Sequence, residues 1–379
     1  MNDAPVKYSS IYLHFPFCES KCHYCDFYSL GREKTGTGDP DLFEKALLQE
    51  IGIRGERGEF ADKIETIFLG GGTPSMTPPE SMERIFNTLF RKTSLDPGYE
   101  WTMEANPSSI TRDRFKAYRN LGINRVSMGV QSLRSDHLLK LGRVHDENEA
   151  LRALESVFES GFTNVSTDLL CGVPGQTLAD LESHIQGLTA FPLTHLSIYL
   201  LTLTPGHPMY RDLPEENEQL DHLAFIHEKM TALGFEHYEI SNFAKPGHRA
   251  RHNLVYWSGG SYLGLGPSAH SFSKSARIRF RNPNSLHRWA TPLLESSGRL
   301  PVEEREELTP EQLDLEKWML AIRLEEGFPR EWLDSESRRK KVEILVREGL
   351  LEPHPRLGDR LRATPRGFAL SDALVRELS

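Results

Sequence analysis

Short apolar runs alternate with amphipathic helical patterns between residues 11 and 233. The apolar runs predict six strands, at residues 11–17, 66–69, 99–104, 125–130, 164–170 and 195–203. Between them, apolar residues recur close to helical spacing and predict helices at residues 41–51, 79–90, 112–121, 147–160, 178–188 and 216–233. Strands that alternate with helices in this way predict an α/β fold with a parallel sheet, either doubly wound or closed as an incomplete barrel.

Polar or small residues stand at the carboxyl ends of five successive predicted strands. In chain order they are Cys18, the glycine run 70–72, Glu104, Gln131 and Asp168. Each has an ordinary explanation when taken alone, since glycine runs form tight turns and a single carboxylate or amide is often solvated. Active sites of barrels, however, gather at the carboxyl ends of many strands. The joint pattern therefore favours an incomplete barrel with one site across these strand ends.

The pattern changes after residue 203. A predicted strand at 235–240 precedes a segment that is rich in glycine, histidine and aromatic residues and shows little helical periodicity. Helical patterns at 309–324 and 338–348, followed by a hairpin and a last helix, resemble a winged-helix unit. We therefore predict three parts, a first domain at 1–245, a connecting segment at 246–295 and a C-terminal domain at 296–379.

Composition and charge exclude several classes of protein. The chain has 379 residues, of which 38% are hydrophobic, a mean hydropathy of −0.47 and a formal net charge of −9. An acidic chain is not typical of a nucleic-acid-binding protein, which needs a basic surface. The acidic net charge also disfavours DNA binding by the winged-helix unit. The first residues do not resemble a signal peptide, and no apolar stretch reaches the length of a membrane span. Four cysteines, three of them clustered, form no disulfide framework and suit the reducing cytoplasm.

Three of the cysteines, Cys18, Cys22 and Cys25, stand in the spacing Cys-x3-Cys-x2-Cys directly after the first predicted strand. Because their number is odd, they cannot all pair as disulfides. A structural zinc site normally needs four protein ligands, and His14 or His23 would have to supply the fourth. A [4Fe–4S] cluster held by three thiolates leaves one iron open for another ligand. The spacing therefore indicates a metal centre, with zinc and an iron–sulfur cluster as the alternatives.

Seven motifs together resemble a known family. They are HFPFCESKCHYCDF, FLGGGTPS, EANP, SMGVQS, LGRVHD, DLLCGVPGQT and HNLVYWSGGSYLGLGPSAHSF, and they extend from residue 14 to residue 272. In this combination they resemble the radical S-adenosylmethionine (SAM) proteins that include oxygen-independent coproporphyrinogen III oxidases and the related HemW-type heme chaperones. The resemblance implies an incomplete (β/α)6 barrel of the TIM type with a small C-terminal winged-helix-like domain, which in this family covers the barrel mouth.

The same resemblance implies two cofactors. Cys18, Cys22 and Cys25 would hold a [4Fe–4S] cluster whose open iron chelates SAM. The residues that would contact SAM are Tyr12, Tyr24, Gly71, Gly72, Thr73, Glu104, Gln131, Arg143 and Asp168. Among them, Arg143 would pair with the SAM carboxylate, which suits its planar fork of donors. The glycines would let backbone groups approach the methionyl end closely, because they lack a Cβ.

The motif HNxxYW supplies candidates for heme binding, namely His252, Tyr256 and Trp257. Neutral imidazole is an iron ligand, and aromatic walls suit a porphyrin face. The ordinary alternative is a packed aromatic turn with a hydrogen-bonded histidine. His270, after the following glycine-rich turn, is a second candidate. Cys171 stands where this family often has a larger residue, and we expect it to be a small buried residue or a redox-active thiol rather than a cluster ligand.

Two functions from different classes follow from the resemblance. One is a heme chaperone that carries the cluster and SAM and transfers heme to an acceptor protein. The other is an enzyme that oxidatively decarboxylates two propionates of coproporphyrinogen III. The oxidase pattern has a further cysteine where this chain has Phe27, and a longer arm than the 17 residues that precede Cys18. These differences and HNxxYW favour the chaperone. A radical enzyme that acts on an unrelated small substrate is a third alternative.

The expected partners follow from the favoured function. They are heme as cargo, a heme-acceptor protein, and an electron donor such as a flavodoxin or a ferredoxin. A homodimer is compatible with the sequence, and no nucleic acid is expected as a partner, because the chain is acidic.

Overall fold

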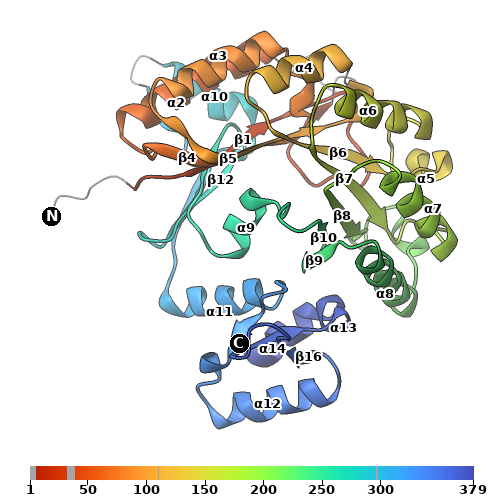
Figure 1. Ribbon diagram of the computed structural model, residues 1–379. Coiled ribbons are helices and arrows are strands. Elements are labelled where there is room, and N and C mark those ends of the chain that lie inside the picture. Colours follow the sequence, from red (N-terminus) through yellow and green to blue (C-terminus); the bar gives the residue numbers. More distant parts are fainter. Residues whose placement is uncertain (1–5, 32–38, 110, 296–297) are drawn as a thin grey trace. The chain divides into compact units, whose positions relative to one another are not determined.

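The computed structural model, drawn in Figure 1, describes residues 6–31, 39–109, 111–295 and 298–379. The chain forms two compact units. The first unit contains Met1–Thr167, Arg251–Tyr256 and Gly260–Leu308. The second unit contains Asp168–Ala250, Trp257–Gly259 and Thr309–Ser379. The three domains predicted from the sequence pattern, at 1–245, 246–295 and 296–379, stay a prediction.

A parallel sheet lies at the centre of the first unit. Its strand order is β11-β1-β4-β5-β6, and every neighbouring pair is parallel. The strands are β1 (Ser10–Phe15), β4 (Lys63–Gly71), β5 (Ser94–Ala105), β6 (Arg125–Gln131) and β11 (Leu263–Leu265). All positions of β1 except Tyr12 are buried, as is typical of parallel strands covered on both faces, and this explains the apolar run in the sequence. The predicted α/β fold with a parallel sheet is confirmed.

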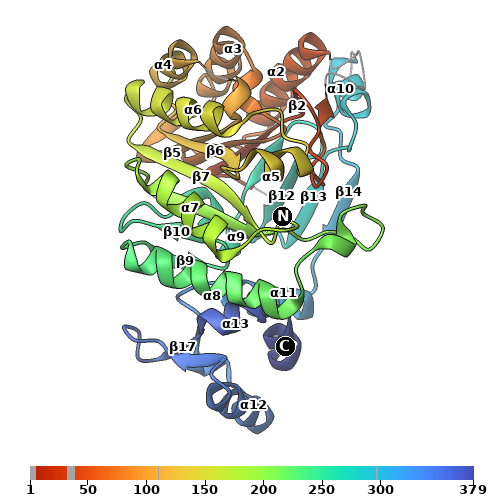
Figure 2. The same ribbon diagram turned by 90° about the vertical axis from the view of Figure 1, so that its right-hand side faces the viewer.

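Helices lie on both faces of this sheet (Figure 1, Figure 2). On one face α10, α2, α3, α4 and α6 pack side by side in this order. Their bounds are α2 (Pro40–Glu56), α3 (Pro79–Phe90), α4 (Arg112–Asn120), α6 (Glu147–Glu159) and α10 (Leu286–Leu294). α9 (Arg251–Trp257) lies against the other face, and α5 (Ser135–Lys140) follows β6.

Capping residues fix where these helices begin. Asp39 accepts a hydrogen bond from the N–H of Leu42 at 2.9 Å ahead of α2. Asp146 and Glu149 form a reciprocal capping box at the start of α6. Such signals are local, and the predicted starts of α2, α4 and α6, which all have a capping side chain, agree with the structure to within one residue.

Residues 246–295 are more regular than their sequence pattern predicts. Besides α9, β11 and α10, they contain the antiparallel strands β12 (His270–Ser273) and β13 (Ile278–Arg281). These two strands form a three-stranded sheet with β14 (Glu304–Glu307), in the order β12-β13-β14. The low helical periodicity of the segment therefore does not mean that it lacks regular elements. The elements are too short to show a period in the sequence, and β11 is recognisable only from its pairing with β1.

Glu50 of α2 connects residues 246–295 to the helices on this face of the sheet through hydrogen bonds. Its side chain is 0% exposed and accepts hydrogen bonds from the N–H of Gly266 and the side chains of Asn282 and Trp289, at 2.9, 2.9 and 3.1 Å. Arg54, one turn further along α2, forms an ion pair with it at 3.2 Å. A buried charge requires this degree of pairing. The motif GLGPSAH is therefore part of a buried polar hub that joins α2, α10 and the turn after β11.

The second unit contains a small antiparallel sheet and two long helices. The sheet order is β8-β10-β9, with β8 (His195–Leu200), β9 (Glu236–Glu239) and β10 (Asn242–Ala244). The helices α7 (Leu178–Thr189) and α8 (Glu216–Ala232) pack against each other. The strand β7 (Asn164–Cys171) contains the division between the units. The predicted sixth strand is too long, because β8 ends before the turn-forming residues of the sequence TLTPG.

The C-terminal residues of the second unit form a helical region, as predicted. The helices α11 (Pro310–Ala321), α12 (Glu336–Arg347), α13 (Pro365–Ala369) and α14 (Ser371–Leu378) accompany a sheet of β15 (Phe328–Pro329), β17 (Arg360–Ala363) and β16 (Leu351–Pro353). Trp318 and Phe328 are 0% exposed in the core of this region, with ring centroids 5.0 Å apart. In the part of the chain that the structure describes, no helix is long and apolar enough to cross a membrane.

Glu239 of β9 is expected to give the protein a specific pH dependence. The carboxyl group is 1% exposed, and this burial raises its pKa from the ordinary 4.5 to about 7. Between these values the folded state holds a proton that the unfolded state has released, so the free energy of unfolding falls as the pH rises. We expect this fall to be about 3 kcal/mol larger in the wild type than in a Glu239→Gln variant. Urea unfolding across this pH range measures the difference, and parallel curves for the two proteins would contradict it.

Candidate functional site

The three clustered cysteines lie on one loop that two short strands close. The strand β2 (Phe17–Cys18) pairs in parallel with β3 (Leu30–Gly31). Between them the chain turns, and the N–H of Cys25 donates to the carbonyl of Cys22 at 3.3 Å. All three residues carry free thiols and are half-buried. This segment, the cysteine loop (residues 17–31), therefore presents three sulfur donors directly after β1.

The donors of the cysteine loop fit an iron–sulfur cluster better than a zinc ion. Of the two histidines that could complete a zinc site, His14 has Nε2 2.8 Å from the carbonyl oxygen of Tyr28, and His23 has Nδ1 3.0 Å from that of Lys140. Among the described residues, no three His, Cys, Asp or Glu side chains are arranged to hold a single metal ion. Burial raises the pKa of Cys18, so binding of a metal centre must displace its proton. Three thiolates without a fourth protein ligand are the set that leaves one cluster iron open.

The guanidinium of Arg143 reaches the cysteine loop from the segment after α5. Its Nη1 donates to the sulfur of Cys22 at 3.4 Å, and its Nη2 donates to the side-chain oxygen of Asn106 at 3.0 Å. Nη2 also donates to the carbonyl of Gly129. Because Asn106 follows β5 and Gly129 lies in β6, Arg143 joins the cysteine loop to two strand ends. A cation held here stabilises thiolates and carboxylates in its vicinity.

The glycine run 70–72 packs tightly against the first strand and the cysteine loop. A Cβ at Gly72 would lie 2.7 Å from the carbonyl oxygen of Phe17. Gly71 has a φ of +105°, and a Cβ there would lie 2.6 Å from the ring of His14. Only glycine fits such positions. Contacts inside the protein thus already require these glycines, and their predicted contact with SAM stays a prediction.

Three further residues predicted for the site lie at adjoining strand ends. Thr73, after β4, donates its hydroxyl to the sulfur of Cys18 at 3.6 Å. A Cβ at Gly70 would lie 3.1 Å from Oε2 of Glu104, so this carboxylate of β5 faces the end of β4. Gln131, the last residue of β6, has a φ of +67°, which is uncommon for a residue with a side chain. Backbone strain of this kind is concentrated at functional sites.

Tyr12 lies on the same face of the sheet as Glu104. Burial, with a smaller contribution from the charge of Glu104, raises the pKa of Tyr12 well above its ordinary value. Its hydroxyl lies 3.1 Å from Nδ1 of His14, and its ring stacks on Phe68 with centroids 6.2 Å apart. Tyr12 is therefore held rigidly beside one of the predicted SAM contacts.

His252 of the HNxxYW motif is buried with both ring nitrogens engaged. It is 0% exposed, with Nδ1 2.8 Å from the hydroxyl of Thr66 and Nε2 2.8 Å from the hydroxyl of Tyr256. Its ring stacks on Phe68 at a centroid distance of 5.3 Å. Burial lowers the pKa of His252 to about 3, so the ring is neutral at neutral pH. This arrangement is the packed aromatic turn with a hydrogen-bonded histidine, the alternative that the sequence leaves beside a heme ligand.

The remaining residues singled out in the sequence lie on different elements and differ in burial. Tyr24 is half-buried on the cysteine loop, and His270 is exposed at the start of β12. Asp168 and Trp257 belong to the second unit. Cys171 ends β7 and is 0% exposed, and its burial raises the pKa of the thiol to about 12. Such a thiol stays protonated, as expected of a small buried residue.

Two polar residues that the sequence pattern does not single out position these groups. Asn106 holds the guanidinium of Arg143, and Thr66 holds the ring of His252. The EANP motif offered a signal for Asn106, since it stands two residues after Glu104 at the end of a predicted strand. Thr66 is a lone hydroxyl in an apolar strand, and only the fold shows that it faces α9.

Known proteins resemble this chain in sequence and in fold. A family model described as the radical SAM superfamily matches residues 12–188. The heme chaperone HemW of Mycobacterium tuberculosis is 34% identical over 376 residues, which cover 97% of this chain and 94% of that protein. The heme chaperone HemW of Escherichia coli (strain K12) is 33% identical over 352 residues, which cover 90% of this chain and 87% of that protein.

One solved structure has a similar fold over nearly the whole chain. Coproporphyrinogen III oxidase (HemN) from Escherichia coli, a radical SAM enzyme, matches with a TM-score of 0.81 and 21% sequence identity, over 99% of this chain and 90% of that chain. At this identity the match speaks for the fold alone, and together with the family model it confirms the predicted radical SAM fold class. The sequence identities, in contrast, are to proteins named HemW. This chain therefore belongs to the HemW family, within the radical SAM superfamily.

Proposed function

We propose that this protein is a heme chaperone that carries a [4Fe–4S] cluster and SAM, binds heme and transfers it to an acceptor protein. The observation that carries the proposal is the cysteine loop, whose three free thiols are held beside Arg143 in a chain that matches a HemW protein over 97% of its length. The loop supports the cluster and SAM. The assignment of heme as cargo is supported by the name that the relatives share.

Each part of the site has one task in this proposal. Cys18, Cys22 and Cys25 hold the cluster, and Arg143 pairs with the carboxylate of SAM. When bound, the cluster supplies one-electron chemistry toward SAM, while the protein orients SAM and excludes water. The proposal requires SAM binding and does not require SAM cleavage. The remaining SAM contacts are proposed to be Tyr12, Tyr24, Gly71, Gly72, Thr73, Glu104, Gln131 and Asp168.

The alternative is an oxygen-independent coproporphyrinogen III oxidase, the activity of HemN, with which this chain shares its fold. The oxidase pattern has a cysteine at the position of Phe27, and here Phe27 is 67% exposed beside the cysteine loop. A phenyl ring offers no sulfur for a metal or for redox chemistry. The residues of this chain therefore support the chaperone better than the oxidase.

The heme contacts of His252, Tyr256 and Trp257 stay a proposal, with one structural condition. Because both ring nitrogens of His252 have hydrogen-bond partners at a fully buried position, ligation of iron would require Thr66 and Tyr256 to release the ring. In the described arrangement His252 instead fixes the hydroxyl of Tyr256. We therefore propose that His252 supports the aromatic wall and is not itself the iron ligand.

The proposal includes partners and a compartment. The partners are a heme-acceptor protein, an electron donor such as a flavodoxin or a ferredoxin, and a second copy of this chain in a homodimer. The compartment is the cytoplasm, because the four free thiols are suited to a reducing environment.

An anaerobic titration of the reconstituted protein with hemin, followed in the Soret band, tests the proposal. We expect saturation at about one heme per chain and release of the bound heme to apomyoglobin as a test acceptor. A His252→Ala variant should keep the position of the Soret maximum, because the ring of His252 is not bound to the iron. A shifted maximum would identify His252 as the ligand. Absence of specific hemin binding would contradict the chaperone, and consumption of coproporphyrinogen with SAM and a reductant would then test the oxidase.

A further inference from the structure

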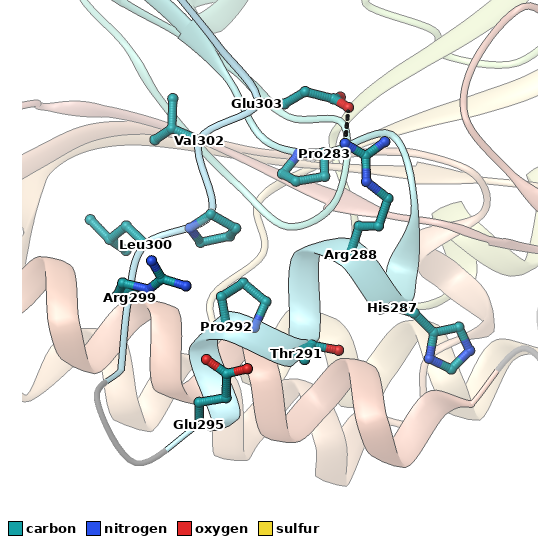
Figure 3. Close-up of a pocket in the computed structure, with 11 residues that line it drawn as sticks. Pro283, His287, Arg288, Thr291, Pro292, Glu295, Arg299, Leu300, Val302 and Glu303 are labelled. Atoms are coloured by element: carbon teal, nitrogen blue, oxygen red, sulfur yellow. Dashed lines mark ion pairs between the residues drawn. The ribbon is translucent and has the colours of Figure 1, made fainter.

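Two cavities flank the segment 299–303 in the first unit. The first, shown in Figure 3, has a volume of about 590 Å³ and lies between this segment and α10. Its charges are balanced, since Arg288 forms an ion pair with Glu303 at 2.7 Å, and Arg299 and Glu295 add one charge of each sign. This cavity therefore gives no indication of the ligand class that it would take.

The second cavity, of about 550 Å³, has an apolar floor. Tyr8 lines it from the segment before β1, and Ile278 and Phe280 line it from β13. Leu300 and Val302 complete the floor, and in Figure 3 both side chains lie on the side of their segment that faces away from α10. The volume lies in the range of cavities that bind drug-sized ligands. The floor therefore suits a ligand with a broad apolar surface.

Charged side chains also line this cavity. The charge of Arg54 is neutralised, because its guanidinium forms ion pairs with Glu59 at 2.7 Å and with Glu50 of the buried hub at 3.2 Å. Arg57 and Arg305 also line the cavity, are exposed, and form no ion pair with any residue that the structure describes. Arg299 lines both cavities, and in Figure 3 its guanidinium extends toward α10, on the side of the first cavity. We call this cavity, with its apolar floor and the guanidinium groups of Arg57 and Arg305, the arginine cleft. It is a positive site in a chain whose net charge is −9.

The arginine cleft is separate from the cysteine loop. Tyr8 precedes β1 and Cys18 follows it, and the six residues of β1 span about 20 Å. Arg305 of β14 lies directly opposite Phe280 of β13 in the antiparallel register, so the guanidinium and the ring share one face of that sheet. The cleft thus combines an aromatic floor and cationic groups at the opposite end of the strand from the proposed cofactor site.

We propose that the arginine cleft, rather than the HNxxYW motif, is the site where the cargo porphyrin binds, an inference that rests on the proposed function. A porphyrin such as heme is a flat apolar ring with two carboxylates on one edge. The ring would lie against the apolar side chains of Ile278, Phe280 and Val302, and the carboxylates would pair with the guanidinium groups of Arg57 and Arg305. Planar guanidinium groups are well suited to carboxylates, which they bind through paired hydrogen bonds.

The composition of the arginine cleft also indicates how the cargo is held. Among the described residues that line it there is no histidine, cysteine or methionine. Its tyrosine, Tyr8, is only 4% exposed, and burial raises the pKa of the phenol, which disfavours the phenolate that would bind iron. The porphyrin is therefore bound through its carboxylates and its apolar face, without a strong protein ligand on the iron. Such binding suits a chaperone, because the cargo can leave for an acceptor that offers the missing iron ligand.

Titration of the reconstituted full-length protein with three probes tests this inference. The probes are hemin, iron-free protoporphyrin IX and protoporphyrin IX dimethyl ester, which lacks the carboxylate charges. We expect hemin and protoporphyrin IX to bind the wild type with affinities within about threefold, since the iron is not ligated. An Arg57→Gln/Arg305→Gln variant should bind both about tenfold more weakly, and should bind the dimethyl ester as the wild type does. Arg288→Gln, at the charge-balanced cavity, is the matched control and should bind hemin as the wild type does.

Three outcomes would overturn the inference. If the double variant binds hemin as tightly as the wild type, the arginine cleft is not the porphyrin site, whereas the proposed function stands. If protoporphyrin IX binds the wild type much more weakly than hemin, an iron ligand elsewhere holds the cargo. If the wild type binds no hemin at all, the proposed function fails and the inference fails with it. An Arg57→Lys/Arg305→Lys variant that regains most of the affinity would show that charge, rather than a folding defect, explains the loss.

Discussion

Replacing Cys22 by Ser is expected to remove the cluster, and with it nearly all iron, from the reconstituted protein. Iron–sulfur clusters are held by soft thiolates, and a serine hydroxyl would leave only two such ligands on the cysteine loop. Cys22 also accepts a hydrogen bond from Arg143 at 3.4 Å, so the same change weakens the contact that holds the guanidinium at the loop. After anaerobic reconstitution, iron analysis and visible absorption should show about four irons per wild-type chain and almost none in the variant.

The matched control is Cys171→Ala. Cys171 is the cysteine outside the loop, and it is buried at the end of β7 with a thiol whose pKa burial raises to about 12. Its removal should leave the iron content unchanged. Wild-type iron content in the Cys22→Ser variant would contradict the cluster assignment. Equal iron loss in both variants would mean that the effect of Cys22 is not specific.

The parts of the site that could be predicted from sequence are those whose geometry is local. The three thiols stand close together in the chain, so their spacing alone indicates a metal centre. Glu104 and Gln131 could be predicted because parallel strands bring their carboxyl ends to one edge of a sheet. The bond from Arg143 to Asn106 and the packing of Gly71 against His14 depend on how separate strands are aligned. The spacing of residues along the chain does not predict how these strands are aligned with one another.

The same distinction explains which parts of the fold could be predicted. Long helices with capping residues and long buried strands carry their signal within one stretch of sequence. β11 and α9 do not, because β11 depends on its pairing with β1 and α9 depends on the bonds of His252 to β4. The sequence did not predict the polar hub either, since a glutamate such as Glu50 in a helical pattern is most often a solvated side chain.

Replacing Glu50 by Ala is expected to lower the free energy of unfolding by about 3–5 kcal/mol. The change would leave three buried donors without their acceptor, on Gly266, Asn282 and Trp289, and would remove one of the two carboxylate partners of Arg54. Each unsatisfied buried donor carries its own desolvation cost. Urea unfolding followed by tryptophan fluorescence measures the loss, because Trp289 lies in the hub itself.

Glu56→Ala provides the matched control for this prediction. Glu56 is exposed near the end of the same helix, and its removal should change the free energy of unfolding by less than about 0.5 kcal/mol. A Glu50→Gln variant separates charge from hydrogen bonding, because the amide keeps one acceptor oxygen but places an NH2 group among the donors. We expect its loss to lie between those of the other two variants. A loss below about 1 kcal/mol in Glu50→Ala would contradict the hub, since α2, α10 and the turn after β11 would then be joined by apolar packing alone.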